Sequence, residues 1–346
     1  MPSPDVDLAT AIDDRGWVDN ASEGLEHAWY AVALSRDVGE QPTKVMALGR
    51  PWIVLRFGSD VAAFADRCPH RLAPLSLGSN RGDHLQCRYH GWEFDPGGTL
   101  TRIPALGDEA TLPRACLERP AEVCERYGLV WIAPKPPVCD LPDFHEWDDP
   151  TFDTSWNEPR RTTAGAHQLC DNFLDAAHLP TVHTRTFGVE DEPFIPPQSV
   201  DRDGWLASTT YRVQYKNHDD PLVESGEHPL VQPQDLYKEC RPATTAFIRL
   251  DFPITGRRIA ILFSCLPATS EETIVFKMMA RNDFDGDATR MADSLAFEDV
   301  VLDEDLEILE AYPNQRLPLD LRTEVHTRVD RLSATYRRIL ADLVIA

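Results

Sequence analysis

Residues 68–92 constrain this chain more than any other stretch, because they combine two short pairs of cysteine and histidine. They read CPHRLAPLSLGSNRGDHLQCRYHGW, so Cys-x-His is followed by sixteen residues and then by Cys-x-x-His. The spacing within each pair lets its two side chains converge on one metal centre. The four candidate metal-binding residues are Cys68, His70, Cys87 and His90. We expect them to lie on two tight turns that face each other.

Three interpretations of these four residues are open: a zinc ion, an iron–sulfur cluster, or no metal at all. Zinc sites usually pair cysteines as Cys-x-x-Cys and take histidines from a helix. Here each turn contributes one cysteine and one histidine. That mixture suits a [2Fe–2S] cluster in which one iron takes two thiolates and the other takes two imidazoles. Neutral imidazoles make such a cluster less negative, which raises its reduction potential above that of an all-cysteine cluster.

The overall charge and the cysteine content exclude several classes of protein. The chain has 34 basic and 57 acidic residues, a net charge of −23, so nucleic acid is not an expected partner. Eight cysteines in 346 residues are too sparse for a disulfide framework, which indicates a reducing compartment. The sequence contains no signal-peptide pattern and no apolar run of membrane-spanning length. We therefore expect a cytoplasmic protein with no membrane segment.

The pattern along the chain predicts three regions. Residues 1–25 are acidic and are expected to be a flexible lead-in. Residues 26–145 alternate short apolar runs with turns, which predicts an antiparallel β domain that carries the cluster. Residues 146–346 add longer strand patterns and two amphipathic helix patterns, at 288–312 and 322–344. The expected fold class is α+β, with the N-terminal β domain followed by an antiparallel sheet covered by helices.

Within the second domain, we expect a helix that starts near residue 168 and is broken by Pro180. A stretch rich in proline and aspartate, residues 135–150, is expected to link the two domains. The predicted strands of the second domain are 205–215, 244–252, 258–266 and 273–282.

A second group of candidate metal-binding residues lies in DNFLDAAHLPTVH, residues 171–183. Asp175, His178 and His183 have the spacing Asp-x-x-His-x4-His. On a helix, Asp175 and His178 would share one face, and the break at Pro180 would let His183 turn back toward His178. Two histidines and one carboxylate form the facial triad of non-haem Fe(II) oxygenases. Solvent-exposed helix histidines are the alternative, but the Cys/His pairs upstream favour an iron site.

Together the two motifs resemble those of the Rieske non-haem iron oxygenases, in particular their catalytic α subunit. The resemblance extends from about His27 to the last helix. The chain length and the aromatic pair at Trp29 resemble the vanillate O-demethylase group. Residues that flank the cluster motif match as well: Pro69, Arg71, Tyr89, Gly91 and Trp92.

The resemblance assigns roles to the candidate residues. Cys68, His70, Cys87 and His90 would bind the Rieske [2Fe–2S] cluster. His178 and His183 would bind a mononuclear Fe(II), and Asp175 would act in catalysis as the bridge between an iron-ligand histidine and a cluster histidine.

The third iron ligand should come from the helix pattern at residues 288–312. The family pattern Glu-Asp-x4-Glu matches residues 304–310 and favours Asp305. Asp303 is the second choice, whereas Asp299 is expected to be a solvated helix charge.

The resemblance implies the oxygenase component of a multicomponent Rieske system that uses O₂. Electrons would come from NAD(P)H through a separate ferredoxin, flavin reductase or both, since this chain has no dinucleotide-binding fingerprint. A homotrimer is implied, in which electrons pass between neighbouring subunits. The expected reaction is monooxygenation, either hydroxylation or oxidative demethylation, of a small aromatic or cyclic organic substrate. The substrate would contact the strands at 244–252 and 274–282 and Phe187.

Three alternatives remain from the sequence. One is a cis-dihydroxylating ring dioxygenase, which would insert both oxygen atoms into its product. The second is a Rieske electron-transfer protein without catalysis, although such carriers are usually near one domain in length. The third is a zinc-stabilised binding protein.

Overall fold

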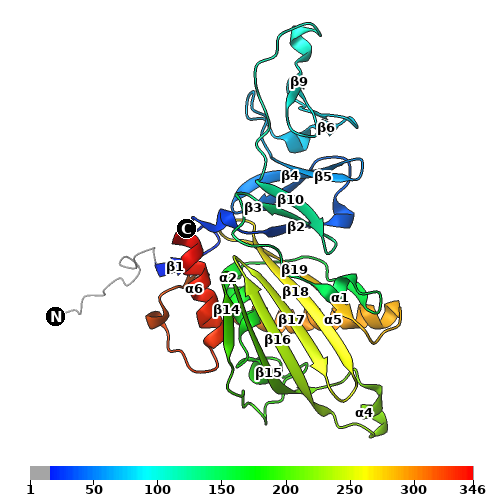
Figure 1. The fold of residues 1–346 in the computed structure, drawn as a ribbon, viewed down its shortest axis with the longest axis vertical. Helices are drawn as coiled ribbons and strands as arrows, with labels where there is room; N and C mark the ends of the chain where they lie inside the picture. The colour runs from blue at the N-terminus through cyan, green and yellow to red at the C-terminus, as the bar shows by residue number, and fades with distance from the viewer. Residues whose placement is uncertain (1–15, 346) are drawn as a thin grey trace, which may run out of the picture.

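The computed structural model describes residues 16–345, which form two parts arranged end to end (Figure 1). Within these residues, the N-terminal part contains antiparallel sheets of strand order β10-β11-β2, β3-β4-β5 and β6-β7-β8-β9. Its strands are β2 (Tyr30–Leu34), β3 (Thr43–Ala47), β4 (Arg50–Phe57), β5 (Asp60–Ala65), β6 (Ser79–Asn80), β7 (Leu85–Gln86), β8 (Glu93–Phe94), β9 (Leu100–Arg102), β10 (Glu122–Arg126) and β11 (Leu129–Ala133). Its 3-10 helices are η3 (Leu25–His27), η4 (Ser35–Asp37), η5 (Leu75–Leu77) and η6 (Pro104–Leu106).

The second part is built on an eight-stranded antiparallel sheet. The strand order is β12-β19-β18-β17-β16-β15-β14, and β13 also pairs with β19. The strands are β12 (Asp153–Trp156), β13 (Arg160–Thr162), β14 (Val200–Asp203), β15 (Leu206–Lys216), β16 (Val231–Arg241), β17 (Thr245–Phe252), β18 (Arg257–Pro267) and β19 (Thr273–Arg281). Long apolar runs in β18 and β19 are buried on both faces, as expected for central strands.

Helices cover the sheet and close its apolar core. They are α1 (His145–Asp148), α2 (Ala166–Leu174), α3 (Leu179–Val182), α4 (Pro221–Ser225), α5 (Ala288–Leu309), α6 (Arg331–Ile345) and η7 (Leu321–Thr323). The apolar side of α5, which includes Leu302 and Leu306, packs with Leu169 of α2 against Phe263 of β18. The Asp287 carboxylate caps α5 by accepting hydrogen bonds from the first free backbone N–H groups.

The two parts share one apolar core. Trp131 of β11 belongs to the same buried cluster as Phe247 of β17. The predicted linker is part of this junction, because Phe144 is fully buried and its N–H donates to the Tyr127 hydroxyl. The Tyr127 hydroxyl in turn donates to the carbonyl of Pro142. The linker therefore fixes the two parts to each other.

The predicted α+β fold class is confirmed, and several element boundaries differ from the predictions. Residues 1–15 of the expected lead-in lie outside the described residues. Part of the remainder is ordered, because β1 (Trp17–Val18) pairs with β20 (Leu317–Pro318). The C-terminal helix begins at Arg331, not at residue 322. Strand β16 was not among the predicted strands.

No helix within residues 16–345 is long and apolar enough to cross a membrane.

Candidate metal centres

The two Cys/His loops lie at the end of the N-terminal part, next to the β6–β9 sheet (Figure 1). The loops have the same backbone hydrogen bonds. Each cysteine carbonyl accepts from the N–H four residues later, at Leu72 and Gly91. Both of these residues have positive φ, at 58° and 70°, which is strained for leucine and free for glycine. Two similar turns thus place their cysteine and histidine side chains close to each other.

The four side chains associate as a cysteine pair and a histidine pair. Cys68 and Cys87 share a hydrogen bond between their sulfur atoms, which raises the pKa of Cys68 and lowers that of Cys87 to about 6. The rings of His70 and His90 are 4.6 Å apart between centroids. This arrangement suits two metal ions that each take one pair, as in a [2Fe–2S] cluster with mixed ligands. It is less suited to one tetrahedral zinc ion.

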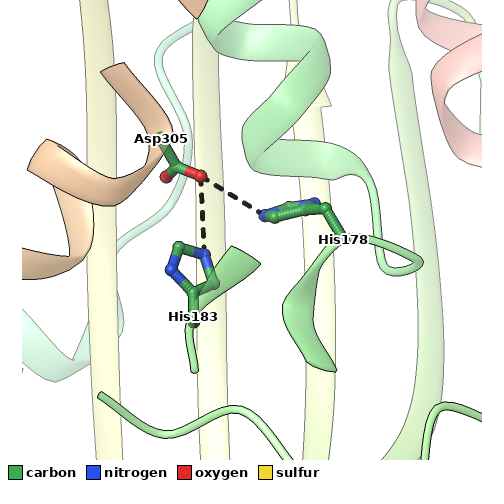
Figure 2. A group of neighbouring side chains, drawn as sticks. All are labelled: His178, His183 and Asp305. Atoms are coloured by element: carbon green, nitrogen blue, oxygen red, sulfur yellow. Dashed lines mark ion pairs between the residues drawn. The ribbon is translucent and has the colours of Figure 1, made fainter. Parts of the chain in front are cut away.

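His178, His183 and Asp305 meet between α3 and α5 (Figure 2). Asp305 Oδ1 lies 3.6 Å from His178 Nε2 and 3.5 Å from His183 Nε2. The three candidate ligand atoms all lie within 4.8 Å of one another, so each can reach one ion at a bond length of about 2.1 Å. The residues chosen from the sequence therefore come together in the geometry of a two-histidine, one-carboxylate site.

The donor set fits a metal ion better than it fits a purely structural cluster. Asp305 Oδ1 is buried and has no hydrogen-bond donor among the described residues. A buried carboxylate oxygen without a partner is costly, and a bound cation would remove that cost. The two other carboxylates considered from the sequence face elsewhere. Asp303 pairs with Arg160 at 2.6 Å, and Asp299 accepts a hydrogen bond from Asn157.

Asp175 contacts His178, but it does so from outside a helix. Helix α2 ends at Leu174, and Asp175 has extended backbone at the C-cap, so the expected continuous helix through both residues is wrong. The Asp175 carboxylate accepts from the N–H and from the ring Nδ1 of His178, the latter at 2.8 Å. Burial alone would raise the pKa of Asp175, but these hydrogen bonds outweigh it and hold the pKa well below its usual value. Pro180 lies in the first turn of α3, which begins at Leu179, and does not break α2.

Glu304 is a candidate site residue that the sequence interpretation did not identify. Its carboxylate is 2% exposed and accepts hydrogen bonds from His183 Nδ1 at 3.0 Å and from the Thr186 hydroxyl at 2.7 Å. It also accepts from the backbone N–H of Arg185. The contact assigns the proton of His183 to Nδ1, which leaves Nε2 free for a metal. The Glu-Asp-x4-Glu pattern at residues 304–310 includes Glu304, but the sequence interpretation took only the iron ligand Asp305 from it.

Lys238 is a second residue that the sequence interpretation did not identify. Its ammonium group is buried at the end of α2 and donates to the carbonyls of Phe173 and Asp175, at 2.9 and 2.7 Å. Burial lowers the pKa of Lys238 to about 8, although the charges of Asp175 and Asp305 oppose this change. Lys238 thus holds the end of α2 from which Asp175 reaches His178.

A cavity opens directly onto the three candidate iron ligands and contains about 770 Å³ of empty space, counting the part open to solvent. Its floor is the inner face of the sheet, where β16, β17 and β18 contribute leucine and isoleucine side chains. Phe187 lines it, as predicted, and so does the predicted strand at 244–252. The predicted strand at 274–282 also lines the cavity, but only through Arg281 and not through its aromatic or methionine side chains.

Comparison with known families gives two matches that together cover most of the chain. The model of the vanillate O-demethylase oxygenase C-terminal domain matches residues 163–346. The model of the Rieske [2Fe–2S] domain matches residues 28–115. Among characterised relatives, methylxanthine N1-demethylase NdmA of Pseudomonas putida is 28% identical over 95% of this chain and 92% of its own length. The oxygenase component of dicamba O-demethylase of Stenotrophomonas maltophilia is 38% identical over 46% of this chain and 48% of its own.

Solved structures show the same architecture. Pseudomonas putida NdmA with caffeine superposes with a TM-score of 0.80 at 26% identity, covering 95% of this chain and 93% of that one. Dicamba monooxygenase bound to dicamba superposes with a TM-score of 0.75 at 22% identity, covering 94% and 98% of the two chains, and shares the fold.

Proposed function

Because the chain belongs to the family of the vanillate O-demethylase oxygenases, we propose that it removes a methyl group from an oxygen or nitrogen atom of a small aromatic or heterocyclic compound. The chain is a Rieske oxygenase component that uses a [2Fe–2S] cluster, a mononuclear iron, O₂ and electrons from partner proteins. Relatives named as N-demethylases and an O-demethylase support the choice of reaction.

The reaction consumes one O₂ and two electrons with two protons. One oxygen atom is inserted into a C–H bond of the methyl group, and the other leaves as water. The product of this step is a hemiacetal or its nitrogen counterpart. The bond between the substrate oxygen or nitrogen and the hydroxylated carbon then breaks. The products are formaldehyde and a substrate with a free O–H or N–H group. NAD(P)H supplies the electrons through a ferredoxin, a flavin reductase or both.

The observation that carries the proposal is the position of His178, His183 and Asp305 at the end of a mostly apolar cavity. We propose that these three residues bind the mononuclear iron, which supplies the activation of O₂ that no side chain can supply. Glu304 orients the His183 ring, and the apolar cavity positions the methyl group and excludes water.

At the other end of the molecule, Cys68, Cys87, His70 and His90 are proposed to bind the Rieske cluster. Asp175 is proposed as the bridge that carries electrons from the cluster of a neighbouring subunit to His178. This role requires the homotrimer expected from the sequence, which remains part of the proposal. A cytoplasmic location, where NAD(P)H is available, is proposed with it. The domain boundaries after residues 25 and 145 also remain proposals.

The first experiment measures iron and acid-labile sulfide per chain and then formaldehyde release. We expect three irons and two sulfides per chain. With a reductase, NAD(P)H and a panel of N-methyl and O-methyl ring compounds, formaldehyde should form in proportion to O₂ consumed. His178→Ala should retain the visible spectrum of the cluster and release no formaldehyde. Products that contain both atoms of ¹⁸O₂, without formaldehyde, would instead identify a ring dioxygenase.

A further inference from the structure

Two glutamines of β16 are buried on the same face of the sheet, and they differ in their hydrogen bonds. Gln232 is fully paired, because its amide nitrogen donates to Asp220 and to the Pro229 carbonyl and its oxygen accepts from Asn217. Gln234 lies two residues further on and is 2% exposed, yet its Nε2 has no partner among the described residues. Gln234 lines the same cavity as the candidate iron ligands. An unpaired amide in this position is available to a bound molecule.

The part of the sheet that follows Gln234 on the cavity floor is apolar. Along the sheet, Leu236 pairs with Leu250 of β17, which pairs with Ile259 of β18. These side chains form a continuous aliphatic floor that suits the face of a flat ring. Leaving a buried amide unpaired beside such a floor costs free energy in the empty protein, and a ligand with a matching polar group recovers it.

The cations that line the cavity are already paired. The guanidinium of Arg281 is bonded to both oxygens of Asp283, to Asp219 and to the Ser294 hydroxyl. Lys238 donates to two backbone carbonyls and interacts with the charge of Asp305. Among the described residues that line the cavity, no cation is therefore left unpaired for a carboxylate group, and a neutral substrate fits the cavity best.

Gln234 and Lys238 are four residues apart on one strand face, a separation of about 13 Å. Lys238 lies at the iron-ligand end of the cavity, because it donates to the carbonyl of Asp175, whose carboxylate contacts His178. A molecule whose methyl group is at the iron ligands would therefore extend along the aliphatic floor toward Gln234. We propose that Gln234 determines specificity by hydrogen-bonding a carbonyl or amide group at the far end of a neutral, ring-shaped substrate. This inference rests on the proposed function and adds the class of substrate to it.

The test uses three matched probes that differ in one substituent: 4-methoxybenzamide, 4-methoxytoluene and 4-methoxybenzoate. Binding to the iron-loaded, oxidised protein is measured without O₂ by calorimetry, so no turnover is needed. We expect the amide to bind about tenfold more tightly than the toluene, the effect of one well-made hydrogen bond. In Gln234→Leu the preference for the amide should disappear, while binding of the toluene is retained or improved.

Thermal unfolding of the same variants separates recognition from a structural role. Gln234→Leu should keep or raise the melting temperature, because it removes a buried polar group that lacks a partner. Gln232→Leu should lower it, because Asp220 and Asn217 each lose a buried hydrogen bond. If Gln234→Leu destabilises the protein as Gln232→Leu does, the amide is structural and the proposal is wrong.

Other outcomes also contradict the proposal. Equal binding of the amide and the toluene would exclude recognition by Gln234. Tightest binding of the benzoate would exclude a neutral substrate, and no binding of any probe would exclude the substrate class. Each of these results is independent of the formaldehyde assay, so demethylation can hold while the role of Gln234 fails. Absence of formaldehyde with every methylated compound would instead contradict the proposed function.

Discussion

At the scale of single residues, each candidate iron-ligand histidine is held by a carboxylate on the ring nitrogen that points away from Asp305. Asp175 holds Nδ1 of His178, and Glu304 holds Nδ1 of His183. Burial would raise the pKa of Glu304, but the hydrogen bonds from Thr186, His183 and Arg185 outweigh it and lower the pKa. A charged carboxylate that accepts from Nδ1 raises the basicity of Nε2 and fixes the orientation of the ring, and both effects favour metal binding by Nε2.

Substitution Glu304→Gln tests this orienting role. We expect Fe(II) affinity at the mononuclear site to fall by about 10- to 100-fold, because a neutral amide no longer fixes the tautomer and angle of the His183 ring. Affinity is measured by equilibrium competition with a chelator, and the cluster spectrum serves as an internal check on folding.

Asp303→Asn is the matched control, since this neighbouring carboxylate is exposed and pairs with Arg160. It should bind Fe(II) as the wild type does. Wild-type affinity in Glu304→Gln, together with a lower melting temperature, would mean that Glu304 only stabilises the loop after His183.

At the scale of elements, the sequence predicted which side chains come together better than it predicted the backbone that carries them. The expected helix through Asp175 and His178 ends at Leu174, yet the two side chains still meet. Their contact survives because the Asp175 carboxylate bonds the backbone N–H of His178 and thereby forms a tight turn. A spacing of three residues brings side chains together in such a turn as well as in a helix.

Strand β16 could not be identified from its composition. Its outward positions carry Pro233, Asp235 and Glu239, which are unusual in strands. Its inward positions carry Gln234 and Lys238, polar residues that disturb the expected alternation of apolar side chains. Both are polar because they line the cavity or hold the end of α2. The pattern was therefore missed at the positions where polar side chains line the cavity in place of apolar packing.

Helix α2 contains a buried histidine that should make the stability of the protein depend on pH. His167 is 1% exposed, neither of its ring nitrogens has a hydrogen-bond partner within residues 16–345, and burial lowers its pKa to about 4. Between the unfolded pKa near 6.5 and the folded value, the unfolded chain takes up a proton that the folded chain does not. His167 should therefore cost about 2 kcal/mol of unfolding free energy between pH 7.5 and pH 5.

Urea unfolding of the wild type and His167→Leu at the two pH values measures this effect. The variant should lose less unfolding free energy between pH 7.5 and pH 5. The difference between the wild-type loss and the variant loss gives the contribution of His167, because the other titrating groups are common to both proteins. Parallel pH profiles would show that the folded protein admits a protonated imidazole at this position.

The contact between α2 and α6 depends on a partly buried ion pair. Arg337 is 6% exposed and donates to Asp171 at 2.8 Å and to Glu324. Arg337→Met should destabilise the protein by at most about 3–5 kcal/mol, because Asp171, whose side chain is 15% exposed, then stays largely buried without its cation. Asp171→Asn combined with Arg337→Met should be more stable than the sum of the single effects predicts. A double-mutant cycle by urea unfolding at pH 7 measures the coupling, and strict additivity would contradict it.

At the scale of the whole molecule, the two candidate metal centres lie in different parts of the folded molecule. Figure 1 shows β6 and β9, the strands next to the cluster loops, at the far end of the N-terminal part, whereas α2 and α5 pack on the large sheet of the other part. The shared core and the packed linker keep these ends apart. A chain with this shape cannot bring its own cluster to its own iron without a large rearrangement. The proposed head-to-tail ring of subunits would solve the problem, because each cluster would then face the iron of a neighbour.

Mixed oligomers test this route directly. Cys87→Ser should lack the cluster, His178→Ala should lack the iron, and each should be inactive alone. In a trimer assembled at random from both chains, three quarters of the rings are mixed, and each has one correct cluster-to-iron interface out of three. Co-expression should therefore restore about a quarter of the wild-type rate of formaldehyde release. Co-expression of Cys87→Ser with a chain that carries both substitutions is the control and should stay inactive. If the first mixture is equally inactive although its subunits co-assemble, electrons must pass within one chain, and the domains must then move relative to each other during turnover.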